Sequence, residues 1–175
     1  MALTVGYAPT QAHTSDRTVF FRAGEVLLQK WPRTVKHVVG GDFNSHFGID
    51  AHEDGWVGRY ALSTPTARKS EIFHEFGTNM DLHHVCSHLH LRGRGTWWNG
   101  AGKKWYENDV FLSTMDPKYF NKLQVFQAVG ADHRGKSVHM FLPGCAKKQF
   151  VLQGLRNESK PQTRLRIDRL LEKSE

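Results

Sequence analysis

Cysteine is scarce in this sequence of 175 residues, which has two, Cys86 and Cys145. Two cysteines so far apart form no disulfide framework and no zinc-ligand spacing. Their scarcity excludes the small secreted domains that disulfides hold together, as well as the cysteine-rich zinc modules. We expect both thiols to be reduced and structural, in a protein that acts inside the cell.

Long apolar runs are also missing. No stretch approaches the roughly 20 apolar residues that a membrane-spanning helix needs, and the first residues lack a basic-then-apolar signal peptide. The hydrophobic content of 39% and the mean hydropathy of -0.53 indicate a globular domain that is soluble in water. We therefore expect no membrane partner.

Acidic residues are outnumbered, because 17 Asp and Glu stand against 24 Lys and Arg, which gives a net charge of +7. Such a balance favours a polyanionic partner. Residues 146–175 contain eight basic and four acidic residues and so contribute +4 of this excess. We expect them to form a basic tail or linker after one domain at residues 1–145, and such a tail is also a common solvated segment. The charge permits nucleic-acid binding without demonstrating it.

Periodicity predicts two helices and roughly seven strands. Apolar positions at helical spacing, among them Val19, Ala23 and Val26, predict a helix over residues 16–31. A second helix is predicted over residues 66–78. Strands are predicted at residues 3–7, 34–39, 81–90, 96–98, 104–113, 122–129 and 136–142. Sheets covered by helices follow from this order, in an α/β or α+β layered domain.

The most informative motif is Gly41-Asp42-Phe43-Asn44, which follows a β-branched apolar segment. We expect Gly40-Gly41 to end that strand in a tight turn. A carboxylate and a carboxamide two residues apart can then point into one pocket, where one holds a metal ion or orients a water while the other donates to a phosphate oxygen. The structural alternative is a turn in which these side chains only cap the backbone.

Two further acidic signals stand downstream, each beside a strand-like run. They are Asn108-Asp109-Val110-Phe111-Leu112 and Ala131-Asp132-His133-Arg134. Asp109 has the alternative of an ordinary edge carboxylate, and Asp132-His133 has the alternative of a plain turn. Together with the first motif, they indicate a site built from carboxylates and an imidazole.

The histidines and tryptophans in the middle of the chain leave two further functions open. On a strand over residues 81–90, alternation would place three histidines on one face, but no second ligand pair stands at a familiar zinc spacing, so a polar strand face is favoured. These histidines are His84, His88 and His90. Trp97, Trp98 and Trp105 can stack on a nucleobase or pack between layers of the core.

The order of the motifs resembles the endonuclease/exonuclease/phosphatase superfamily, which includes deoxyribonuclease I and the exonuclease III type of abasic-site endonucleases. The matching segments are Tyr7-Ala8-Pro9, Gly41-Asp42-Phe43-Asn44, Thr96-Trp97, Asn108-Asp109-Val110-Phe111-Leu112 and Ala131-Asp132-His133-Arg134. Three more segments are similar to the endonuclease domains of non-LTR retrotransposons and to the craniofacial-development-protein-like sequences derived from them. They are Ser70-Glu71-Ile72-Phe73-His74-Glu75-Phe76, Met80-Asp81-Leu82 and Thr96-Trp97-Trp98. The resemblance covers about residues 3–142.

The resemblance implies a four-layer sandwich of two β-sheets flanked by helices, of which this chain holds a part. Family members begin with an Asn-bearing strand and a Glu-bearing strand, both well before the Tyr-x-Pro segment, whereas six residues precede Tyr7 here. We therefore expect the chain to be the C-terminal part of the family domain, with the N-terminal half missing.

The activity implied by the resemblance is metal-dependent phosphodiester hydrolysis of DNA by an endonuclease of retrotransposon type, acting in the nucleus. The Glu of the missing half is a principal ligand of the catalytic Mg²⁺ in the family. This chain is therefore expected to be weakly active or inactive, and whether it is an enzyme by itself stays open.

The resemblance also implies roles for single residues. Asp42 would orient or activate the attacking water, and Asn44 would fix that water or a phosphate oxygen. His133 would contact the scissile phosphate, with its tautomer set by Asp109. Tyr7 would donate its hydroxyl toward the phosphate, although a tyrosine that ends a strand is as often a half-buried packing residue.

The metal implied by the resemblance would lie near Asp42 and Asp132. Oxygen ligands with retained waters suit Mg²⁺, with Mn²⁺ as a substitute.

Two other functions stay open. Half a sandwich leaves sheet edges and apolar surface uncovered, which favours a non-catalytic module that binds nucleic acid or a protein completing the sandwich. A phosphoesterase acting on a small phosphoester, such as a phosphoinositide, would keep the family and change the substrate.

Overall fold

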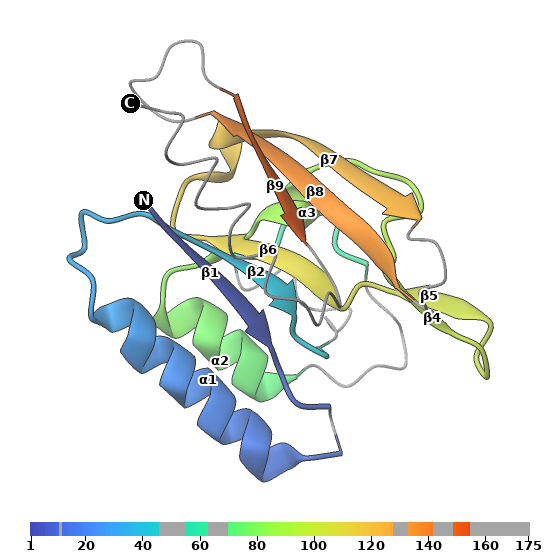
Figure 1. Ribbon diagram of the computed structural model, residues 1–175, viewed down its shortest axis with the longest axis horizontal. Coiled ribbons are helices and arrows are strands. Elements are labelled where there is room, and N and C mark those ends of the chain that lie inside the picture. Colours follow the sequence, from blue (N-terminus) through green and yellow to red (C-terminus); the bar gives the residue numbers. More distant parts are fainter. Residues whose placement is uncertain (11, 46–54, 63–69, 128–132, 142–148, 155–175) are drawn as a thin grey trace, which may run out of the picture.

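Two helices, a four-stranded sheet and a three-stranded sheet form successive layers in the computed structural model (Figure 1). The structure describes residues 1–10, 12–45, 55–62, 70–127 and 133–141, and the backbone of 149–154. The α+β sandwich of two sheets predicted from the sequence is confirmed. No helix in these described ranges is long and apolar enough to cross a membrane.

The four-stranded sheet has the strand order β1-β2-β6-β3. Strand β1 (Ala2–Tyr7) runs parallel to β2 (His37–Asp42), and helix α1 (Thr14–Gln29) makes the crossover that parallel neighbours need. Strand β6 (Asp109–Ser113) is antiparallel to β2 and pairs on its other side with the short β3 (His83–His84). The chain thus places the ends of β1 and β2 beside the start of β6.

Strand β2 runs through the two glycines at which the sequence predicts a turn. A Cβ atom at Gly41 would lie 1.9 Å from the carbonyl oxygen of Gly6, and one at Gly40 would lie 2.8 Å from the Phe111 ring. The glycines therefore serve close approach of the neighbouring strand and ring. The predicted turn is wrong, and Asp42 is the last residue of the strand.

Helix α1 buries a face different from the predicted one. Val19 and Val26, two positions of the predicted face, are 69% and 57% exposed. The buried positions are spaced three or four residues apart, and they are Arg17, Phe21, Glu25 and Leu28. Glu25 can be buried because its carboxylate accepts a hydrogen bond of 2.9 Å from the Asn79 side chain. An apolar pattern does not detect polar residues that are buried in this way.

The helical side of the sheet is packed with aromatic rings. Helix α2 (Glu71–Asn79) begins after Ser70, which is its N-cap, so the predicted helix over residues 66–78 starts later, and residues 66–69 lie outside the described ranges. The Phe43 ring stacks on Phe73 with centroids 5.3 Å apart. Because Phe43 follows Asp42 directly, its burial fixes the position of the carboxylate before it.

The predicted strand over residues 81–90 is wrong. After two residues of β3, the chain turns into the short helix α3 (Val85–His88). The His84 imidazole accepts a hydrogen bond of 3.1 Å from the Ser87 main-chain N–H and so caps this helix. The histidines therefore do not share a strand face, and the zinc alternative loses the geometry on which it depended.

The predicted strand over residues 104–113 is two strands that belong to different sheets. Strand β5 (Lys104–Tyr106) forms a hairpin with β4 (Trp97–Asn99), while β6 joins the four-stranded sheet. The hairpin extends from the body of the domain beside the start of β6 (Figure 1). Residues 107 and 108 connect the two sheets.

The three-stranded sheet is antiparallel and covers the other face of β2 and β6. The 3₁₀ helix η2 (Pro117–Tyr119) leads into β7 (Phe120–Gln127), which pairs with β8 (Arg134–Phe141). The core between the sheets includes Val38 and Phe111 from one sheet and Val138 and Met140 from the other. Strand β9 (Gln149–Gly154) pairs with β8, so this part of the expected tail belongs to a sheet. The division at residue 145 stays a prediction.

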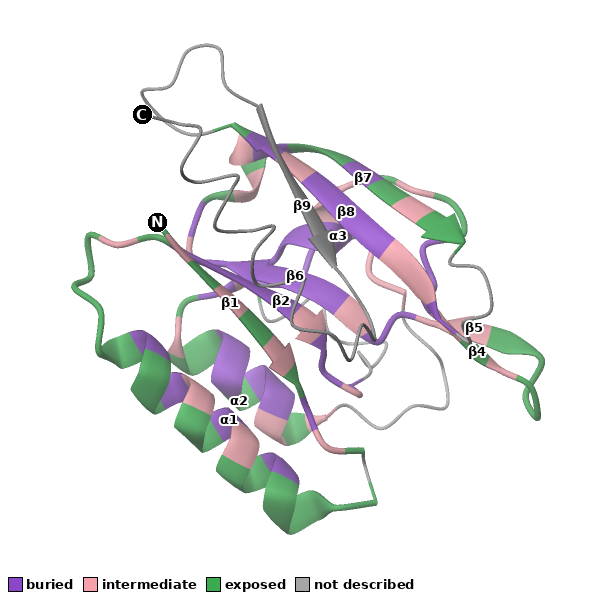
Figure 2. Cartoon of the chain, in the orientation of Figure 1, coloured by how far each residue is buried: buried purple, intermediate pink, exposed green. Residues whose placement is uncertain are grey.

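Strand β1 is the edge strand of its sheet in the described part of the chain, and Figure 2 shows exposed and intermediate positions along it. A Cβ atom at Gly6 would meet the Phe20 ring of α1, so the even positions face the helix. The odd positions face the opposite way, and Leu3, Val5 and Tyr7 are 47%, 77% and 61% exposed. The second sheet covers β2 and β6 but leaves these side chains of β1 in solvent.

Candidate active site

Tyr7, Asp42 and Asp109 lie in one row across three neighbouring strands. The strand register pairs Tyr7 with Asp42, and Asp42 with Asp109. Tyr7 and Asp42 end parallel strands and Asp109 begins the antiparallel one, so all three lie at the same end of the sheet. The topology thus brings together three motifs that are far apart in the sequence.

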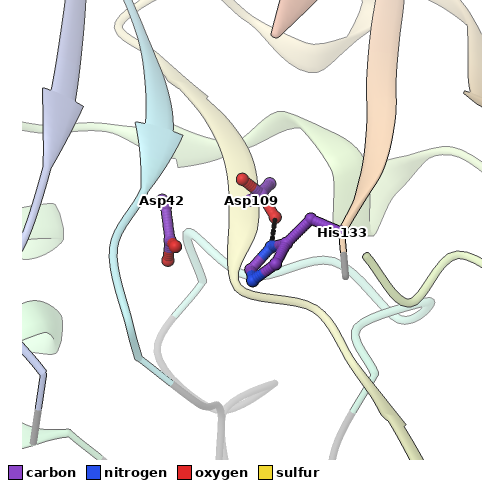
Figure 3. Close-up of side chains that lie close together, drawn as sticks. All are labelled: Asp42, Asp109 and His133. Carbon is purple, nitrogen blue, oxygen red and sulfur yellow. Dashed lines mark hydrogen bonds and ion pairs between the residues drawn. The ribbon is translucent and has the colours of Figure 1, made fainter. Parts of the chain in front are cut away.

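His133 reaches this row from the second sheet. It forms an isolated bridge with Trp97, and Arg134 donates its main-chain N–H to the Thr96 carbonyl over 2.7 Å. His133 Nδ1 then lies 3.0 Å from Oδ2 of Asp109 (Figure 3). The imidazole is 5% exposed and the carboxylate 17%, so this hydrogen bond is largely shielded from water.

Asp42, Asp109 and His133 each offer one ligand atom, and these atoms lie within 4.8 Å of one another. We call these three residues the strand-end site. Figure 3 shows its carboxylates and imidazole at the ends of strands from both sheets. Two carboxylates and one imidazole at this spacing could together hold a divalent cation. Asp132, which the resemblance also places near a metal, lies outside the described residues.

Asp42 also shapes the loop that follows it. Its Oδ1 accepts a hydrogen bond of 2.9 Å from the Asn44 main-chain N–H. Asn44 has a φ of 45°, in the left-handed region that asparagine tolerates better than most residues. The amide nitrogen of Asn44 donates to the Ala8 carbonyl over 2.7 Å and so ties the loop after β2 to the loop after β1. A contact between Asn44 and a phosphate stays a prediction.

Arg17, which the sequence analysis missed, holds the same loops from the helical side. Its guanidinium donates to the carbonyls of Pro9 and Asn44 over 2.8 and 3.1 Å, and to the hydroxyls of Ser45 and Ser70 over 2.7 and 3.0 Å. Burial lowers the pKa of this guanidinium from its ordinary value. One buried cation therefore joins α1, α2 and both loops at the strand-end site.

The main chain of Asp109 is held on both sides. Its N–H donates to the Thr96 hydroxyl over 3.1 Å, and its carbonyl accepts a hydrogen bond of 2.7 Å from the Lys136 ammonium. The Lys136 side chain is 1% exposed, and its Nζ also lies 2.6 Å from Oε1 of Glu107. These contacts fix the residue that holds the imidazole.

Glu107 is bound by two cations, Arg94 and Lys136, and we call these three residues the buried triad. Arg94 Nε lies 2.9 Å from Oε2 of Glu107, and the guanidinium also donates to the carbonyls of Tyr60 and Cys86. Burial by itself raises the pKa of Glu107, but the Lys136 ammonium and the Arg94 guanidinium hold it at about 2. The glutamate is therefore ionised at neutral pH, and the buried triad carries a net positive charge.

His84 is fully buried beside this triad, and burial lowers the pKa of its imidazole to about 3. Between this value and the ordinary pKa of about 6.5, the unfolded chain binds a proton that the folded chain does not. The free energy of unfolding should therefore fall by about 1.4 kcal/mol per pH unit from His84 as the pH drops through this window. Urea unfolding at several pH values above the titration range of the carboxylates measures the slope.

The matched variant for this pH dependence is His84→Asn. Asparagine keeps an acceptor for the Ser87 N–H that caps α3 but does not titrate. We expect the slope between about pH 6.5 and 4.5 to flatten in this variant. An unchanged slope would show that other histidines cause the pH dependence.

The tryptophans lie on two faces of the β4–β5 hairpin. The Trp97 ring lies beside the site, with its centroid 6.4 Å from that of His133. Trp98 packs on Trp105 at 5.4 Å and is 41% exposed, and the Arg134 guanidinium lies 3.5 Å from the Trp105 ring centroid. Packing therefore accounts for part of each ring, and stacking on a nucleobase stays a prediction for the exposed part of Trp98.

Comparison with known proteins identifies a solved structure with a similar fold. No protein-family model and no curated protein sequence matches the chain. Among solved structures, the chain is similar to a 3'-5' exonuclease (NExo) from Neisseria meningitidis, with a TM-score of 0.55 and 17% sequence identity. The match covers 78% of this chain and 59% of that one, so the chain spans about three fifths of the length of the exonuclease. The two proteins share a fold.

Proposed function

We propose that this chain is part of a metal-dependent nuclease that hydrolyses phosphodiester bonds in DNA. The strand-end site carries the proposal, because two carboxylates and an imidazole offer ligand atoms within 4.8 Å at one end of the sheet. The fold shared with a 3'-5' exonuclease supports it. We further propose an endonuclease of non-LTR retrotransposon type that acts in the nucleus, with Mg²⁺ as its metal and Mn²⁺ as a substitute.

The residues of the site divide the work of hydrolysis in this proposal. A divalent cation bound near Asp42 would neutralise phosphate charge and make a bound water more acidic. Asp42 orients the attacking water, and His133 contacts the scissile phosphate. Asp109 holds the imidazole through Nδ1, so the other ring nitrogen is the one presented to substrate. Tyr7, whose strand position is in register with Asp42, would donate its hydroxyl toward the same phosphate.

Supercoiled plasmid tests this function directly. We expect the chain to convert it slowly to the nicked form with Mg²⁺ or Mn²⁺ and not with EDTA. Turnover should be weak, because the Glu that the resemblance implies as a principal metal ligand is not among the three residues of the strand-end site. Asp42→Asn should abolish nicking and weaken Mn²⁺ binding, measured by calorimetry, by about 10- to 100-fold.

Asp116→Asn is the control for this experiment, since Asp116 pairs with Lys118 on the surface. Nicking that persists in EDTA or in Asp42→Asn would contradict the proposal, and so would a parent chain that neither binds Mn²⁺ nor nicks. If the substrate is a small phosphoester, its hydrolysis should depend little on salt concentration. If the substrate is DNA, binding releases counterions, so the affinity should fall steeply as the salt concentration rises.

A second function, a protein-binding module, is favoured by the open face of β1. Leu3 and Val5 are 47% and 77% exposed on a strand that has a neighbour on one side in the described sheet. A partner strand could pair with this edge and cover both side chains. Hydrogen exchange separates the two functions, because a partner that pairs with β1 would protect its amides, while metal-dependent nicking without any partner would favour the enzyme.

A further inference from the structure

The buried triad lies next to the strand-end site and performs no part of the proposed hydrolysis. Burying three charged groups is costly, and a well-packed apolar group of the same size often gives an equally stable protein. Stability alone is therefore a weak reason for Lys136, whose side chain is 1% exposed between the sheets. Its contacts suggest another role.

Lys136 links the two strands that must meet for the site to form. It lies on β8, three residues after His133, and its ammonium donates to the main-chain carbonyl of Asp109 at the start of β6. These strands belong to different sheets. The second contact of the ammonium, 2.6 Å to Glu107, fixes its direction. Arg94 binds the other oxygen of Glu107 and does not depend on Lys136 for this contact.

We propose that Lys136 is a positioning residue of the strand-end site, and that it holds the carbonyl of Asp109 so that the carboxylate meets His133. This inference rests on the proposed function for the reaction that the site performs. Lys136 touches neither substrate nor metal and acts through the main chain of Asp109. Within the triad, Glu107 and Arg94 join the two ends of the β4–β5 hairpin, whereas Lys136 connects the triad to Asp109 of the strand-end site.

The experiment compares three variants of the full chain. Lys136→Met removes the ammonium and leaves Glu107 to Arg94 alone, which is expected to destabilise the fold. The double variant Glu107→Gln, Lys136→Met removes both charges of the pair and should recover much of that stability. Ser113→Ala is the control, because it removes a buried hydrogen bond of 2.8 Å to His37 at the far end of the same strand.

The first readout is the low-field proton resonance of the His133 Nδ1–H, assigned by its loss in His133→Gln. We expect it in the parent and in Ser113→Ala, and we expect it shifted or lost in both Lys136 variants. The second readout is Mn²⁺ affinity, which should fall by about 10- to 100-fold in the double variant. Where nicking is measurable, kcat should fall by a similar factor while KM for DNA stays constant.

The outcomes separate this inference from the proposed function. A double variant that unfolds like Ser113→Ala but keeps both the parent resonance and the parent Mn²⁺ affinity would overturn the positioning role. A parent without the resonance would overturn it too, since there would be no hydrogen bond to position. A parent that shows the resonance and loses it in the double variant, yet neither binds Mn²⁺ nor nicks DNA, would keep the inference and refute the nuclease.

Discussion

Asp109→Asn is expected to lower metal-dependent nicking by about 100-fold or more. Asparagine has the shape of aspartate but presents an NH₂ group as well as an oxygen, so it no longer fixes one tautomer of His133 across the 3.0 Å hydrogen bond. The site also loses one of its two carboxylates. Initial rates on supercoiled plasmid and calorimetric titration with Mn²⁺ measure the two effects.

The fold should survive this substitution. The main-chain contacts of Asp109 to Thr96 and Lys136 do not involve its carboxylate, so the thermal unfolding midpoint should stay close to that of the parent. Asp116→Asn again serves as the surface control. A folded Asp109→Asn chain that nicks at the parent rate would remove the carboxylate–imidazole pair from the mechanism.

Glu107→Ala is expected to be the most destabilising single change at the buried triad, with a loss of about 3–5 kcal/mol in the free energy of unfolding. The substitution leaves Arg94 and Lys136 buried without the carboxylate that both contact. The side chains of the triad are 5% exposed or less, so water cannot take the place of the lost carboxylate unless the structure opens locally. Urea unfolding monitored by tryptophan fluorescence gives the change.

Asp116→Asn is the matched control for the loss of an ion pair, because asparagine keeps an acceptor for the Lys118 main-chain N–H. Asp116 and Lys118 pair at 2.9 Å, but their side chains are 50% and 66% exposed, so we expect no measurable change in stability. If Glu107→Ala cost less than about 1 kcal/mol, the two buried cations would have found other partners. The distinct role given to Lys136 would then lose its basis.

The sequence predicts the strand-end site better than it predicts the elements that carry it. Asp42 and His133 stand beside strand-like runs and Asp109 stands within one, and the structure brings the three together even though the predicted turn at Gly40-Gly41 is wrong. A strand that ends three residues later than predicted still places its last side chain at the same end of the sheet. What the pattern could not provide is the reason for the glycines, since a Cβ atom would meet β1 at Gly41 and the Phe111 ring at Gly40.

Buried charges account for most of what the sequence did not predict. Arg17 is spaced four residues from Phe21 on the buried face of α1, but a rule that seeks apolar faces rejects it. Lys136 stands two and four residues before Val138 and Met140, on the strand face that enters the core. That alternation could have predicted that Lys136 is buried. Its partner Glu107 is 29 residues away in the sequence, and the two meet only because of the strand topology.

The open face of β1 has a consequence for handling the protein. Unpaired main-chain groups along the margin of a sheet are a template on which a second molecule can add its own strand, and Leu3 and Val5 supply apolar area beside it. Charged side chains often prevent this kind of strand addition, and the segment Ala2–Tyr7 contains none. We therefore expect self-association through this edge to increase as the protein concentration rises.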